Sequence, residues 1–136
     1  MNNNWYNAPA SAAASGLDIV RITVALILAI HAGHGLFDPE GMIGFGKYLS
    51  SVGFPFGAAL VWAIVLIQIL SSTALIVRRL IVPACVCQIV ILVSGIWLIH
   101  FHHGWFVVGD GRNGMEFSVT LIACLFAVLW AYWPRR

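Results

Sequence analysis

The chain has 136 residues, of which 61% are hydrophobic and only 9% are charged. These proportions exclude an ordinary soluble domain, in which about a quarter of the residues are charged. The formal net charge of +2 also gives no basic surface of the kind that binds nucleic acid. We therefore expect an integral membrane protein whose partners include membrane lipid and no nucleic acid.

Four apolar segments are long enough to cross a membrane, at about residues 17–37, 57–77, 80–100 and 115–133. A spanning helix needs about 20 mostly apolar residues, and helices are the open-chain structures that pair every backbone group in lipid. The short connections favour antiparallel neighbours. The sequence predicts an all-α fold, an integral membrane four-helix bundle, with residues 1–136 as a single transmembrane domain.

Basic residues are unevenly distributed between the two sets of helix ends. Arg21, Arg78, Arg79, Arg135 and Arg136 fall at one set, and Lys47 and Arg112 at the other. The positive-inside rule then places the N- and C-termini in the cytoplasm. Residues 1–16 lack the basic region of a signal peptide, so we expect a polar N-terminal tail.

All five histidines lie in two short motifs, "HAGH" and "HFHH". A rise of about 1.5 Å per residue puts His34, His100 and Glu116 at one level near the outer end of the hydrocarbon. His31 lies one turn deeper on the same helix face as His34, and Gln68 lies deeper again. Because ionisable groups inside a membrane mark functional sites by default, we expect a polar cleft narrowing toward the bilayer centre.

Structural roles for the same residues stay open. His31 and His34 could pair with Gln68 or Glu116 simply because a buried polar group needs a hydrogen-bond partner. Gln68 could act as an amide that packs helices together. Glu116, following the glycine-rich "GDGRNG", could be placed by the helix dipole alone.

An outer-surface element is also predicted in "GMIGFGKYL", the segment before the second span. Met42, Phe45 and Leu49 recur at about helical spacing, which favours a one-turn amphipathic lid. The three glycines of the segment weaken a longer helix.

In order and spacing, several motifs resemble the DoxX family of small bacterial four-helix membrane proteins, over residues 18–132. They are Arg21 at the start of the first helix, then "HAGHGLF", "FGKYLSSVGFP", "LIQILSSTALIV", "RR", "IHFHHGWF" and "NGMEFSVTLIA". The chain departs from the family in carrying Gln68, Ser71 and Ser72 where a glutamate and paired glycines are usual. An amide there removes a proton-carrying group.

The resemblance implies a multi-pass protein of the bacterial inner (cytoplasmic) membrane that belongs to a redox complex. Family members resemble membrane subunits of oxidoreductases, including one subunit of a thiosulfate:quinone oxidoreductase. Our first hypothesis is therefore a membrane subunit of a respiratory or envelope oxidoreductase that binds quinone in the outer cleft, with partner subunits carrying the substrate chemistry. The catalytic residues would be His34 and Glu116. The quinone-binding set would be His31, His34, Gln68, Trp97, His100 and Glu116.

Two further hypotheses remain. Imidazole is a common ligand of haem, copper and zinc, so a metal site could use His31, His34, His100 and His103, or a haem could bind between His34 and His100. His100 and His102 could share a metal only if the helix ended between them. The third hypothesis is an assembly or scaffold subunit without its own chemistry. Self-association into a homodimer could occur through its tryptophan-rich surface.

Overall fold

The computed structural model describes residues 10–108 and 113–134. All regular structure in these ranges is helical, as the sequence predicts. The elements are α1 (Ala10–Leu36), α2 (Pro39–Ser51), α3 (Gly57–Ile76), α4 (Ile81–Leu98), a 3₁₀ turn η1 (His100–His103) and α5 (Glu116–Tyr132).

Three of these helices are long and apolar enough to cross a membrane, at Ala13–Leu36, Gly57–Ile76 and Ile81–Leu98. The apolar helix α5 is shorter, with 17 residues, and at 1.5 Å per residue it covers only about 25 Å. The chain is therefore a membrane protein. The prediction of four equivalent spans is not confirmed, because the described residues form five α-helices, of which three are full-length span candidates.

Two helix boundaries differ from the predicted ones. Helix α1 begins at Ala10, inside the segment expected to be a polar tail, because the alanine-rich stretch that precedes the first span has high helix propensity. Residues 1–9 lie outside the described ranges. Helix α4 ends at Leu98, before His100, and η1 then carries His100, His102 and His103. The helix ends before the first of these histidines, not between His100 and His102.

Helix α2 is longer than the single turn expected from the sequence. It has 13 residues, with Pro39 in its first turn and the Asp38 side chain accepting a hydrogen bond from Gly41 N at 3.0 Å. Proline at the first helical position and an aspartate N-cap both favour helix initiation, and they offset the glycines. Leu49 is buried on the inner face of this helix.

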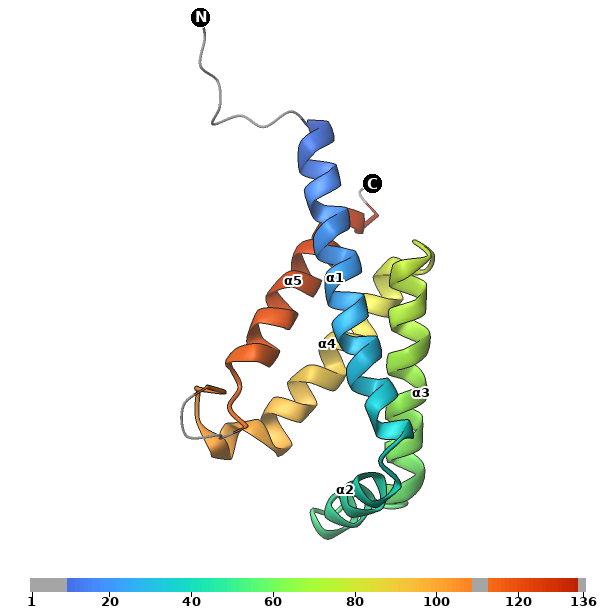
Figure 1. The fold of residues 1–136 in the computed structure, drawn as a ribbon, viewed down its shortest axis with the longest axis vertical. Coiled ribbons are helices and arrows are strands. Elements are labelled where there is room, and N and C mark those ends of the chain that lie inside the picture. The colour runs from blue at the N-terminus through green and yellow to red at the C-terminus, as the bar shows by residue number, and fades with distance from the viewer. Residues whose placement is uncertain (1–9, 109–112, 135–136) are drawn as a thin grey trace, which may run out of the picture.

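The four long helices pack in a ring in which α1 contacts α3, α3 contacts α4, α4 contacts α5, and α5 contacts α1. Figure 1 shows the start of α1 and the end of α5 at one end of the bundle, with α2 and η1 toward the other. We call the first the arginine end, for Arg21 and Arg78, and the other the histidine end, for His34 and His100. The cytoplasmic location of the arginine end stays a prediction.

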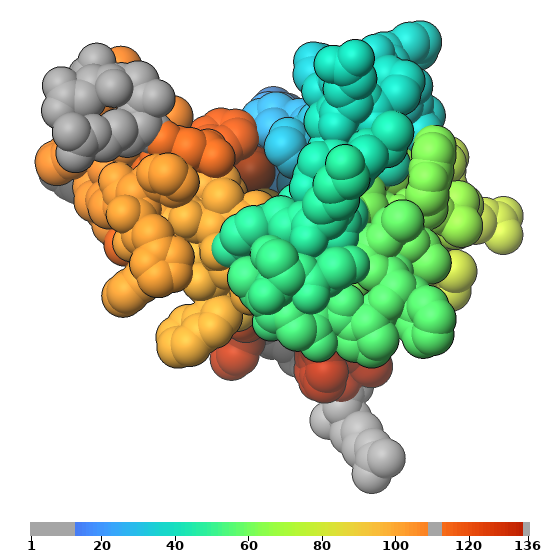
Figure 2. Space-filling view, turned by 90° about the horizontal axis from the view of Figure 1, so that it is seen from below, coloured from blue at the N-terminus to red at the C-terminus, as the bar shows by residue number. Residues whose placement is uncertain are grey.

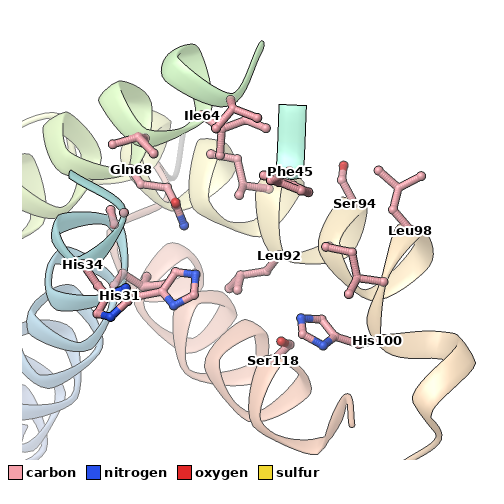
Figure 3. Close-up of a pocket in the computed structure, with 18 of the residues that line it drawn as sticks. His31, His34, Phe45, Ile64, Gln68, Leu92, Ser94, Leu98, His100 and Ser118 are labelled. Carbon is pink, nitrogen blue, oxygen red and sulfur yellow. The ribbon is translucent and has the colours of Figure 1, made fainter. Parts of the chain in front are cut away.

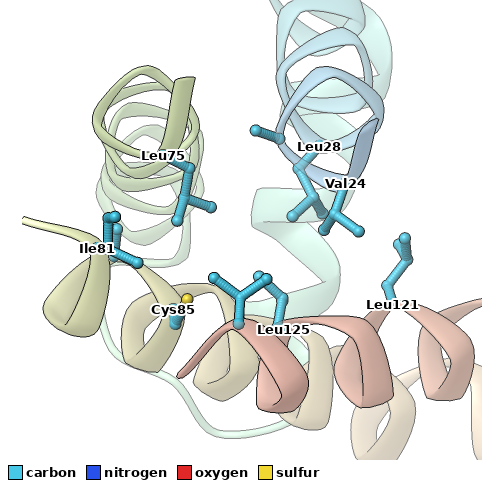
Figure 4. Packing of buried hydrophobic residues seen from close by; sticks show 10 residues of the cluster. Val24, Leu28, Leu75, Ile81, Cys85, Leu121 and Leu125 are labelled. Carbon is cyan, nitrogen blue, oxygen red and sulfur yellow. The ribbon is translucent and has the colours of Figure 1, made fainter. Parts of the chain in front are cut away.

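The hydrophobic core lies between all four ring helices and toward the arginine end. Figure 4 shows Val24 and Leu28 of α1 facing Leu75 of α3, Cys85 of α4 and the α5 leucines. Leu28, Leu75 and Cys85 are at most 1% exposed. The apolar packing that holds the ring together is therefore concentrated away from the histidines.

Polar contacts add to this fastening at the arginine end. Arg21 is 4% exposed, and its guanidinium donates to the carbonyl oxygens of Leu75 and Ile76 at the end of α3. It also donates to Asp18 Oδ1 at 3.1 and 3.2 Å, and the Tyr132 hydroxyl donates to the same oxygen at 3.2 Å. These bonds reach carbonyl groups in the last turn of α3, where few intrahelical donors remain, and they join α1, α3 and α5.

Candidate functional site

A cavity of about 700 Å³ occupies the histidine half of the bundle. Its walls come from all five helices, η1 and the segment before α5, and most of the lining side chains are apolar, among them Leu28, Phe45, Val65 and Leu92. A cavity of this size with a mostly apolar lining and a few polar groups has the usual character of a small-molecule site.

The polar groups of the cavity come from different helices. His31 and His34 belong to α1, Gln68 to α3 and His100 to η1, and all four side chains line the same space. Figure 3 shows the two α1 histidines on one wall and His100 on the opposite wall, with Leu92 between them. Four of the residues that the sequence placed in a polar cleft therefore do share a cavity.

Viewed from the histidine end, the surface has two sides. Figure 2 shows α2 (teal) with the neighbouring part of α3 (green) on one side, residues around η1 (orange) on the other, and part of α1 (blue) between them. Tyr48 joins these sides, because its hydroxyl donates to the carbonyl oxygen of Leu98 at 2.5 Å. At the histidine end, α2 and the end of α4 are therefore bridged by this hydrogen bond.

The imidazole of His100 has a defined hydrogen-bonding role. Its Nδ1 lies 2.8 Å from the carbonyl oxygen of Asn113, which precedes α5. Because a carbonyl only accepts, Nδ1 must carry the proton, and the Nε2 of a neutral ring is then left as an acceptor. Within the described ranges, the rings of His31 and His34 have no hydrogen-bond partner, so their N–H groups are available to a ligand.

Gln68 is supported by a second glutamine that sequence reasoning missed. The Nε2 of Gln88 donates to the backbone oxygen of Gln68 at 3.0 Å and to Ser72 Oγ at 3.1 Å. Gln88 is 0% exposed. The signal for this pair was in the sequence, because Gln68 and Gln88 are equidistant from Arg78 and an antiparallel hairpin turning there puts them at one depth.

Glu116 opens α5 as predicted, but it is not among the residues that line the cavity. Its Oε1 accepts a hydrogen bond from Val107 N at 2.9 Å, and its own N–H donates to the carbonyl oxygen of Trp105 at 3.0 Å. Both contacts fasten the segment that follows η1 to the start of α5. A catalytic role for Glu116 stays a prediction.

Two other residues of the predicted site lie away from the cavity. Trp97 is 74% exposed and stacks on Phe101 with ring centroids 6.4 Å apart. His103 lines an adjoining, shallower groove between α2 and η1, together with His102 and Tyr48. The end of α4 at Leu98 explains the placement of His103, because the chain turns before His100 and redirects the side chains that follow. Trp97 still belongs to α4 and is exposed on its outer face.

The metal hypothesis needs several ligands around one point. Among the residues that the structure describes, no group of three or more histidine, cysteine, aspartate or glutamate side chains could hold a metal ion. His31, His34 and His100 line the cavity while His103 lies in the groove. The four-histidine site therefore stays a prediction without a preformed ligand set.

A family model described as DoxX matches residues 16–101, well over half of the chain. The chain belongs to the DoxX family. The matched range contains the cavity residues His31, His34, Gln68 and His100, whereas Glu116 lies outside it. The search of curated proteins and the search of solved structures each found no match to this DoxX protein.

Proposed function

We propose that this DoxX protein binds a quinone in the cavity of its histidine half and serves as the membrane subunit of an envelope or respiratory oxidoreductase. One observation carries the proposal, namely a mostly apolar cavity of about 700 Å³ with imidazoles on opposite walls. The family resemblance to oxidoreductase subunits supports the redox assignment. Partner subunits would supply the electron-transferring chemistry.

The lining suits a flat, apolar ring with an oxygen atom on each side. Phe45, Leu92 and their apolar neighbours provide the slot. On one wall His31 and His34 offer N–H donors for a carbonyl oxygen. On the other wall, the bond to Asn113 leaves Nε2 of a neutral His100 to accept the proton of a hydroxyl group. Such an arrangement binds the oxidised and reduced ligand through different histidines.

The direct test is to measure quinone in the purified protein and then quinone binding by its variants. We expect lipid extracts of the protein, purified in mild detergent, to contain quinone detectable by mass spectrometry. Rebinding of a short-chain benzoquinone, followed by tryptophan fluorescence, should weaken in His31→Ala and His100→Ala. Each lost hydrogen bond is worth about 0.5–1.5 kcal/mol, so the dissociation constant should rise roughly two- to tenfold.

His102→Ala is the matched control, because His102 is also a histidine of η1 but lines the shallow groove and not the cavity. It should bind quinone like the unmodified protein. Equal losses in His100→Ala and His102→Ala, or no quinone binding at all, would contradict the proposal. A Soret band or stoichiometric metal that disappears in His34→Ala would instead establish a haem or metal site.

A further inference from the structure

Helices α1 and α5 pack against each other in the arginine half of the bundle and are separated in the histidine half, where they form one side of the cavity. The face that α1 turns to α5 carries Val24 and Leu28 in the arginine half, followed by His31 and His34 at helical spacing. On α5, Leu125 and Leu121 are followed toward the helix start by Phe117. The same two helix faces thus line first the core and then the cavity.

Exposure along these faces shows where the two helices part. Leu28 is 1% exposed and Leu121 is 5% exposed, whereas Phe117 is 50% exposed although it lines the cavity. The side chains of His31 and His34 are exposed as well. Figure 1 shows α1 and α5 close together toward the arginine end and apart toward the other. Because cavity-lining side chains are exposed on both helices, we take the cavity to be open between them.

The sides of the cavity between α2 and α3, α3 and α4, and α4 and α5 are packed, and one hydrogen bond bridges α2 and the end of α4. Helix α2 lies directly on α3, because a Cβ on Gly57 would meet the carbonyl oxygen of Gly46 at only 2.1 Å. Tyr48 ties α2 to the end of α4 through its bond to Leu98. Helix α3 packs against α4 and α4 against α5. A ligand that enters through the gap between α1 and α5 needs none of these contacts to break.

The depth of the gap decides what it opens to. His31 lies within the apolar span Ala13–Leu36, about 8 Å from its end at Leu36 by the helical rise. Phe117 and Leu121 lie on the apolar helix α5. A membrane spanned by α1 would place hydrocarbon chains beside the gap at this depth.

We propose that the gap between His31 of α1 and Phe117 of α5 is a lateral portal through which a long-tailed lipid enters from the membrane and in which its tail remains. The proposal rests on quinone binding in the cavity and names the ligand class as polyprenyl quinones. The ring lies among the histidines, and the isoprenoid tail leaves between α1 and α5 into the bilayer.

The test is photolabelling of the full chain in nanodiscs of phosphatidylethanolamine and phosphatidylglycerol. The probe is a farnesyl-1,4-benzoquinone with a diazirine at the end of its tail, and labelled residues are located by mass spectrometry. We expect labels on the histidine half of α1 and the first turns of α5, and we expect excess tail-less benzoquinone to displace them. Labels concentrated on α2 or η1 would overturn the portal.

A bulkier side chain in the gap provides a second readout. Phe117→Trp should lower the labelling yield roughly tenfold or more, because overpacking a gap that the tail fills disfavours binding. Phe126→Trp is the matched control, since Phe126 is similarly exposed on α5 but lies outside the cavity lining. An equal fall in both variants would contradict the portal.

Failure of the portal and failure of quinone binding give different results. If tail-less benzoquinone binds while the tail probe labels α2 or η1, the cavity still binds quinone and only the lateral route is wrong. If a diazirine-bearing phospholipid labels Phe117 equally and quinone never displaces it, ordinary lipid fills the gap and the inference is overturned. If neither the tail-less benzoquinone nor the farnesyl-1,4-benzoquinone probe binds, the proposed function itself fails.

Discussion

The guanidinium of Arg21 on α1 donates to the backbone oxygen of Leu75, at the end of α3. This bond lies beside the apolar core, in which Leu75 is 0% exposed. The arginine end is thus fastened by core packing and by charged hydrogen bonds together. Among the described residues, the histidine end, where the cavity lies, has fewer such contacts between α1 and α5, so the tightly fastened part of the fold and the cavity lie toward opposite ends.

The first prediction concerns this fastening. Arg21→Met removes the donors to Leu75, Ile76 and Asp18 while keeping an unbranched side chain of similar reach. We expect a loss of about 2–4 kcal/mol in the free energy of unfolding, because hydrogen bonds to charged groups are worth roughly 1.5–3 kcal/mol each and part of the Asp18 interaction is exposed to solvent. Thermal or detergent-induced unfolding of the purified protein measures it.

Arg79→Met is the control for the first prediction. Arg79 is exposed on the turn after α3, and surface charges contribute about 0–1 kcal/mol. If Arg79→Met destabilised the protein as much as Arg21→Met, the loss would come from general charge and not from the bonds of Arg21.

The second prediction tests how α2 is attached. Gly57→Ala places a methyl group where the backbone oxygen of Gly46 lies, 2.1 Å from the ideal Cβ position. Backbone cannot move aside as a side chain can, so α2 must shift and we expect destabilisation by about 1–3 kcal/mol. Gly44→Ala is the matched change on α2, because nothing lies within 4 Å of its Cβ position.

For Gly44→Ala we expect a neutral effect or a gain of up to about 1 kcal/mol from helix propensity. Unfolding midpoints of the two variants, measured side by side, decide the matter. A Gly57→Ala protein as stable as its Gly44→Ala counterpart would show that α2 is a loosely attached lid.

The sequence was sufficient for the features that depend on local pattern. Long apolar runs located the spans, and the helical spacing of His31 and His34 placed both on one face of α1, where they line the cavity. Helix α2 was underestimated because its three glycines argue against a helix, whereas the cap by Asp38 stabilises it. Cap geometry depends on backbone angles that composition does not reveal.

Features that depend on contacts between distant segments were less accessible. The bond from Arg21 to Leu75 joins residues on different helices, whereas in the sequence Arg21 indicated only the orientation and the family resemblance. His103 fell outside the cavity because α4 ends at Leu98, whereas Trp97 is still on α4 and faces outward. The predicted helix boundary was off by only two residues, and side chains beyond that point face other surroundings.

The third prediction concerns the buried amide of Gln88. Its Nε2 makes two hydrogen bonds, but within the described residues its Oε1 has no partner. An unpaired buried acceptor costs about 1–3 kcal/mol, which offsets much of what the two donated bonds contribute. We expect Gln88→Leu, of similar volume, to change the free energy of unfolding by no more than about 1 kcal/mol.

Leu75→Ala sets the scale for that measurement, since removing a fully buried leucine side chain costs about 2–5 kcal/mol. Unfolding of both variants in the same detergent gives the comparison. A Gln88→Leu loss as large as that of Leu75→Ala would mean that Oε1 has a partner, such as an internal water molecule, whose bond is worth keeping.

The last prediction separates a structural from a chemical role for Glu116. Glu116→Gln keeps an oxygen to accept the hydrogen bond from Val107 N but cannot carry a proton as a carboxylate does. Because Glu116 lies outside the cavity lining, we expect the glutamine variant to match the unmodified protein in unfolding midpoint and in quinone affinity within about twofold. Glu116→Ala removes the acceptor and should cost about 1–2 kcal/mol of stability. The two variants are compared by thermal unfolding and by quinone titration. Unchanged stability with lost quinone binding in Glu116→Gln would contradict this expectation. The carboxylate of Glu116 would then belong to the binding site, because only its charge or its proton would account for the loss.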